Sequence, residues 1–131
     1  MPDRLSIHAP VLVNTIGHCA GAIIFGILLH LFILDWRRAT GERSVLPVIA
    51  AGLGLLWNLG SLIGMATAPE GDPVADVIVA GSFSVLSLLP AVLLHISLRS
   101  RHPALWIAGY GVSFAAVLLH IGDLITTAAR F

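Results

Sequence analysis

Four of the six histidines lie inside long apolar stretches, where an ionisable side chain is costly and is a functional candidate by default. These four are His18, His30, His95 and His120. Imidazole is a regular ligand for metal ions and for the iron of a haem, and it also relays protons. The chemistry that these residues make available is therefore metal or haem ligation, or proton transfer, at membrane depth.

The depths of the four histidines fall into two pairs. At ~1.5 Å per helical residue, His30 and His95 lie ~6–8 Å from the arginine-bearing ends of their stretches. On the same measure, His18 and His120 both lie ~25 Å from those ends. Two imidazoles that face each other at one level of a helical bundle suit a flat metal macrocycle with an axial ligand on each side. The spacing predicts an inner pair, His30 with His95, and an outer pair, His18 with His120.

These pairs predict two stacked haems, because 12 residues along the first stretch separate the two levels by ~18 Å. No Cys-x-x-Cys-His motif is present, so each haem would be held without a covalent link, as haem b. Arginines near the inner level are candidates to bind the anionic propionates. They are Arg37, Arg38, Arg99 and Arg101. Bis-histidine ligation fills both axial positions, which favours an electron carrier over a catalyst, and no catalytic residue is predicted.

Two further polar residues lie near these levels. Asn58, in the middle of the second apolar stretch, has two interpretations: a hydrogen bond to a haem edge or a quinone, or a hydrogen bond between helices. Asp123 follows His120 by one helical turn, and is either an acceptor for the ring N–H or a solvated acid at a helix end. A quinone is thus a second candidate ligand, and a quinone or a redox protein is the expected electron partner.

The elements that must position these residues follow from the composition. The chain has 131 residues, is 57% hydrophobic and 11% charged, and has a mean hydropathy of +0.96, which is too apolar for a soluble domain of this size. Its charges cancel, which argues against a nucleic-acid partner. Four stretches are long and apolar enough to cross the lipid bilayer as helices. We therefore predict one all-α domain, a transmembrane four-helix bundle with helices at about 9–34, 45–69, 74–98 and 103–128.

The loops between these stretches predict the orientation. The first and third loops hold five of the seven arginines, whereas the second holds none and carries Glu70 and Asp72. Since cytoplasmic loops collect positive charge, both termini are expected on the outer side.

Glycines at four-residue spacing predict close packing between helices, with space for a flat ligand as the alternative. They are Gly17 and Gly21 in the first stretch, and Gly60 and Gly64 in the second.

Two parts of the chain resemble the N-terminal membrane region of certain bacterial sensor histidine kinases. One is Gly17–His30, GHCAGAIIFGILLH, and the other is Leu56–Leu62, LWNLGSL, followed by Phe83–His95, FSVLSLLPAVLLH. The segment from Tyr110 to His120 fits this pattern less distinctively. The resemblance implies a ligand- or redox-sensing input module in a bacterial cytoplasmic membrane, with His18, His95 and His120 as its important positions and a signalling domain as partner.

The chain departs from that pattern, because it contains no kinase and, with both termini outside, a kinase would need a further crossing. The paired histidines are also similar in architecture to four-helix membrane b-type cytochromes. Three functions stay open on the sequence: a di-haem electron carrier, a sensing module, and a haem-free assembly or transport subunit.

Overall fold

The computed structural model describes residues 3–41, 43–67, 73–99 and 101–128, and within these ranges the chain is helical with no strand. The helices are α1 (Asp3–Arg38), α2 (Leu46–Thr67), α3 (Pro73–Leu98) and α4 (Pro103–Ala128). The all-α prediction is therefore confirmed. Three helices begin and end within two residues of the predicted bounds, whereas α1 extends further at both ends. Glu70 and Asp72 of the second loop lie outside the described residues.

All four helices are long and apolar enough to cross a membrane. The spans are Pro10–Arg38, Leu46–Thr67, Val77–Leu98 and Pro103–Thr126. Large apolar side chains are exposed along all of them, as expected when lipid rather than a protein core covers a helix. These features indicate a multi-pass membrane protein.

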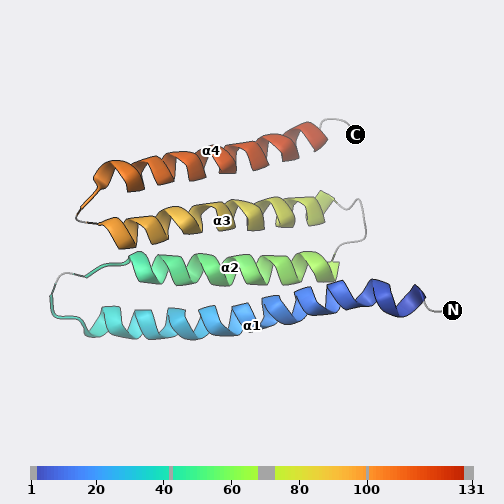
Figure 1. Ribbon diagram of the computed structural model, residues 1–131, viewed down its shortest axis with the longest axis horizontal. Coiled ribbons are helices and arrows are strands. Elements are labelled where there is room, and N and C mark those ends of the chain that lie inside the picture. Colours follow the sequence, from blue (N-terminus) through green and yellow to red (C-terminus); the bar gives the residue numbers. More distant parts are fainter. Residues whose placement is uncertain (1–2, 42, 68–72, 100, 129–131) are drawn as a thin grey trace.

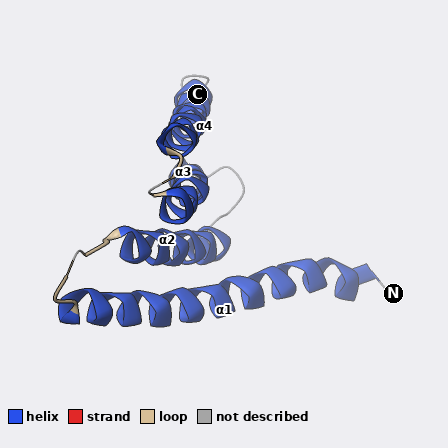
Figure 2. Ribbon diagram, turned by 60° about the vertical axis from the view of Figure 1, so that its left-hand side comes forward, coloured by secondary structure: helices blue, strands red, loops and turns tan. Residues whose placement is uncertain are grey.

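In the described part of the chain, the helices form an open array in which each packs against its neighbours in sequence and no others. Within the described residues, helix contacts occur between α1 and α2, between α2 and α3, and between α3 and α4. Figures 1 and 2 both show α2 and α3 lying between α1 and α4, which form the two edges of the array. The termini lie at one end of the array, and the first and third loops lie at the other (Figure 1).

The two inner helices carry the tightest packing. Small residues on α2 are buried, namely Ala50, Ala51, Gly54 and Gly64. A Cβ placed on Gly60 would overlap the hydroxyl of Ser82 on α3, and one on Gly21 would overlap the amide of Asn58. Gly17 has no neighbour within 4 Å of its would-be Cβ. Of the four glycines singled out in the sequence, Gly21 and Gly60 therefore permit close approach, and Gly17 does not face a neighbouring helix.

Candidate functional site

The first polar contact between helices joins His18 on α1 to Asn58 on α2. The His18 Nδ1 and Asn58 Oδ1 atoms are 3.1 Å apart, and Asn58 Nδ2 donates to the Gly54 carbonyl at 2.7 Å. Because the amide nitrogen is used by Gly54, the oxygen of Asn58 faces the imidazole, so Nδ1 carries the hydrogen and donates it. Asn58 is only 3% exposed, which makes this contact the buried centre of the α1–α2 interface.

With the hydrogen on Nδ1, the second ring nitrogen of His18, Nε2, carries a free lone pair. Nε2 lies across the ring from Nδ1, faces away from Asn58 and makes no hydrogen bond with the described residues. The indole of Trp57 meets the His18 ring edge-on, with ring centroids 4.9 Å apart. An imidazole whose N–H is held by an acceptor while its second nitrogen is free has the form of a metal or haem ligand. His18 is thus half-buried and oriented, and its Nε2 has no partner among the described residues.

The second contact joins α3 to α4 through an aromatic cluster. His95 stacks on Trp106 with ring centroids 4.1 Å apart and an interplanar angle of 6°. Its Nδ1 lies 3.3 Å from the Tyr110 hydroxyl, which can act as donor or acceptor. The Trp106 Nε1 atom is buried without a hydrogen-bond partner among the described residues. The adjacent helix α4 therefore contacts one face of the His95 ring and one of its nitrogens.

The other two intramembrane histidines differ from each other. His120 on α4 lies near Phe83 on α3, with ring centroids 5.9 Å apart. His30 is exposed on α1 and has neither a hydrogen bond nor a ring contact within the described part of the chain. Three of the four predicted ligands thus lie at interfaces between adjacent helices.

The predicted pairs are not brought together within one chain. His18 and His120 stand on the two edge helices, α1 and α4, and His30 and His95 stand on α1 and α3. Neither α1 with α4 nor α1 with α3 is a contacting pair in the described residues. The same part of the chain holds no group of three metal-ligating side chains. Nε2 of His18 is available as one axial ligand, and no helix contact in the described residues joins the members of either predicted pair, so the bis-histidine haem stays a prediction.

The charged candidates lie at the ends of the helices. Arg37, Arg38, Arg99 and Arg101 are exposed at the end of the array that carries the first and third loops. Asp123 is exposed, and its side chain makes no hydrogen bond to His120. The solvated-acid interpretation of Asp123 therefore agrees with the structure better than the ring-acceptor interpretation.

The partners of the histidines were the part that the sequence reasoning missed. Tyr110 and Trp106 had no role as partners of His95, and Asn58 was matched to a cofactor or to an unspecified helix rather than to His18. A usable signal existed, because a polar side chain in an apolar helix must find a polar partner, and the adjacent helix is the nearest source.

Comparison with known proteins adds no relative. The chain matches no family model, no curated protein and no solved structure. The fold therefore defines the class: a four-helix protein with membrane-spanning helices, in which histidines contact the adjacent helix.

Proposed function

We propose that this chain is a membrane input module whose histidines bind a metal ion or a haem. This binding changes how neighbouring helices pack. The observation that carries the proposal is the His18–Asn58 contact. One ring nitrogen is bonded to the next helix and the other is free, so a ligand on Nε2 acts on the α1–α2 interface through a single rigid ring. His95 makes the equivalent link between α3 and α4 through Tyr110.

The segments that resemble sensor kinases support this proposal by where they meet. His18 and Gly21 of the first segment contact Asn58 of the second. His95 and Phe83, at the two ends of Phe83–His95, contact Tyr110 and His120 of α4. The resemblance thus falls on residues that link neighbouring helices. An input module in a bacterial cytoplasmic membrane, read by a signalling domain, would use these links.

The ligand class follows from the donor. A neutral imidazole nitrogen binds zinc, copper and iron, including the iron of haem b. When bound, such a group would supply the signal through a change in the charge or the coordination of the metal. The chain's own part is to orient Nε2 through Asn58, to shield it beside Trp57, and to couple the ring to α2.

The orientation in the membrane is part of this proposal. Both termini lie outside and the arginine-bearing loops lie in the cytoplasm, in accordance with the positive-inside rule. Both of these loops lie at one end of the array (Figure 1), so their arginines share one side of the membrane.

The test uses Trp57 as the reporter, because it touches the His18 ring. Trp36 and Trp106 are changed to Phe, the protein is placed in lipid nanodiscs, and Zn²⁺ or haem b is titrated while Trp57 emission is followed. We expect a saturable change with at least one probe that is lost in His18→Leu and kept in His102→Leu, a histidine at a helix end. No saturable change with either probe, or the same change in His18→Leu, would overturn the proposal.

A second candidate, a di-haem b-type electron carrier, is favoured by the matched depths of the histidines. In the open array it requires α1 to meet α3 and α4 in another arrangement or in another copy of the chain. The oxidised and dithionite-reduced spectra, with pyridine haemochrome quantification, decide it. Two haems per chain, reduced to one in His95→Ala, would establish this carrier, and a haem content unaffected by His95→Ala would remove the pairing.

A further inference from the structure

One ionisable side chain at membrane depth faces away from the rest of the chain. His30 on α1 is exposed, and it has neither a hydrogen bond nor a ring contact within the described residues. Its helix is an edge of the array, since α1 contacts α2 and no other helix in the described part of the chain. The ring therefore faces the lipid, where an imidazole is costly and normally has a polar partner.

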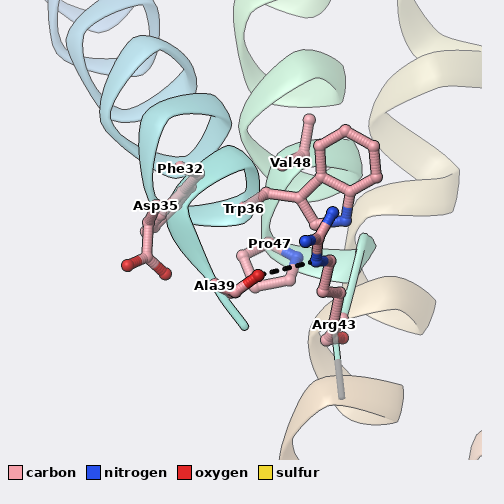
Figure 3. A pocket seen from close by; sticks show the side chains of 8 residues that line it. Phe32, Asp35, Trp36, Ala39, Arg43, Pro47 and Val48 are labelled. Carbon is pink, nitrogen blue, oxygen red and sulfur yellow. Dashed lines mark hydrogen bonds between the residues drawn. The ribbon is translucent and has the colours of Figure 1, made fainter. Parts of the chain in front are cut away.

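The loop end of α1 shows how deep this ring lies. The Arg43 Nε donates to the Ala39 carbonyl at 2.9 Å, and Figure 3 shows the guanidinium beneath the Trp36 indole, with its carbon 6.0 Å from the ring centroid. Tryptophan and arginine mark the level of the lipid headgroups, and His30 precedes Trp36 by six residues, or ~9 Å of helix. Side chains on a helix also tilt toward its N-terminus, which carries the short His30 ring away from these headgroups. The ring thus lies in hydrocarbon.

The described chain offers His30 no partner of its own. Asp35 is the nearest acid along α1, but at 100° per residue it lies about 140° around the helix from His30. The His18 ring is bonded to α2, and His95 and His120 stand on helices that α1 does not contact in the described residues. A partner for His30 must therefore come from outside these contacts.

We propose that two copies of this chain associate through α1, with His30 of one copy hydrogen-bonded to His30 of the other. Copies of one membrane protein insert with the same orientation, so equivalent residues lie at equal depth, and a two-fold axis along the membrane normal brings them face to face. A neutral imidazole has one donor and one acceptor nitrogen, so two such rings are electrostatically complementary to each other. The second copy thus supplies, at this depth, the polar group that the described chain does not.

His30 also identifies the face of α1 that meets the second copy, because α1 is apolar around its whole circumference and hydropathy marks no face. Steps of four and three residues from His30 follow one face of the helix, with the 3.5-residue period of two helices packed in parallel. The row consists of His30, Gly26, Ile23, Cys19, Ile16 and Leu12. Its side chains are exposed, and a Cβ on Gly26 would meet nothing within 4 Å. The small residues Cys19 and Gly26 let two such rows approach closely.

This contact leaves the α1–α2 interface in place. Phe25, whose ring fills the space beside Gly54 of α2, lies about 140° around α1 from His30. A second α1 would therefore pack on nearly the opposite side from α2 and continue the array into the second copy. Arg37 is next in the row, but it lies in the last turn of α1, where headgroups and water screen its charge.

Cys19 allows a direct test, because it is the one cysteine of the sequence and lies in this row. Membranes that contain the full chain are oxidised with copper phenanthroline, and covalent dimer is measured on a non-reducing gel. We expect a disulfide-linked dimer in the unchanged protein and, in a Cys19→Ser background, with Ile23→Cys but not with Ile24→Cys. Ile23 and Ile24 are similarly exposed, at 65% and 56%, but Ile24 lies about 120° around the helix from His30. No dimer through Cys19, or as much dimer from Ile24→Cys as from Ile23→Cys, would overturn the proposal.

The part played by His30 itself is measured by energy transfer between copies labelled at a C-terminal tag, in lipid vesicles over a range of protein-to-lipid ratios. We expect His30→Leu to raise the dissociation constant of the dimer about fivefold, the usual effect of one hydrogen bond between membrane helices. His30→Gln keeps a donor and an acceptor and should retain most of the affinity. Equal dissociation constants for His30→Leu and the unchanged protein would contradict the pairing.

Two further variants separate this surface from the rest of α1. Gly26→Leu should weaken the dimer, whereas Gly17→Leu is the matched control, because its Cβ is equally free but lies off the row. His18→Leu should leave the association unchanged, since its ring faces α2. The input-module proposal depends on His18, so it stands or falls separately from this one.

Discussion

The hydrogen on the His18 ring is placed by a chain of two bonds that begins in the backbone of α2. The Gly54 carbonyl accepts a hydrogen bond from Nδ2 of Asn58, and Oδ1 of Asn58 accepts one from Nδ1 of His18. Gly21 makes this possible, because a side chain there would occupy the space of the Asn58 amide. Three residues thus fix which nitrogen of one imidazole is free, and this choice decides what the histidine can bind.

The tautomer can be measured without any ligand. Asn58→Leu removes the acceptor, so we expect the ¹⁵N spectrum of His18 to change from a single Nδ1–H form to a mixture with the Nε2–H form. The α1–α2 interface should also weaken by about 1 kcal/mol, the usual size of a hydrogen bond between membrane helices. Asn14→Leu is the control, since Asn14 donates to the Met65 sulfur at 3.3 Å and has no hydrogen bond to His18. An unchanged His18 spectrum in Asn58→Leu would show that Asn58 does not set the tautomer.

Part of the site could be predicted from residue types alone. An ionisable ring in an apolar helix is conspicuous, so His18 and His95 were found directly from the sequence. Their partners were harder to find, because depth alone matches any residue at the same level on any helix. Asn58 and Tyr110 become partners only once it is known that each helix packs on its sequence neighbour.

At the scale of the elements, α2 carries the packing. It contacts both α1 and α3 and has four of its small residues buried, whereas no residue of α1 from 10 to 38 is buried. Helices in lipid gain little from burying apolar surface, so they associate where small side chains let their backbones approach. Gly60 is such a position between α2 and α3, because Ser82 occupies the space that a Cβ on Gly60 would need.

Gly60→Ala should therefore destabilise the α2–α3 interface by about 1–3 kcal/mol, the usual cost of overpacking. Gly17→Ala is the matched control, because its Cβ would meet nothing within 4 Å. It should be neutral or slightly stabilising, since alanine is a better helix former than glycine. Reversible unfolding of the two variants in mixed micelles provides the comparison, and equal stability would contradict the assigned contact.

The order of the helices in space was not predictable for a physical reason. The spans were evident from hydropathy, but α1 is apolar around its whole circumference, so its sequence has no periodic stripe that marks a packed face. Matched histidine depths suggested that α1 meets α3 and α4, whereas among the described residues α1 contacts α2 and neither α3 nor α4.

At the scale of the whole molecule, the arginine distribution predicts the orientation in the membrane. With both arginine-bearing loops at one end of the array, a reporter fused after Phe131 should lie outside the cytoplasm. An alkaline phosphatase fusion is then active, and a green fluorescent protein fusion at the same position is dark. The opposite pattern would place the arginine-bearing loops outside the cytoplasm and would contradict the proposed orientation.

The openness of the array separates the two candidate functions, and it can be measured as one distance. Spin labels replace Ile24 on α1 and Phe114 on α4 in a Cys19→Ser background. Both residues are exposed, and they lie 14 and 11 residues from the loop-bearing ends of their spans, Arg38 and Pro103. With two helices between them, the labelled helices should be ~24–30 Å apart, because neighbouring axes are ~8–10 Å apart. Double electron–electron resonance in nanodiscs measures this distance with and without haem b. A long distance in both conditions fits an open input module, since α1 never reaches the histidines of α3 and α4. A collapse to ~10 Å would mean that α1 packs on α4, and the His18–His120 haem site would then be a structure that one chain can build.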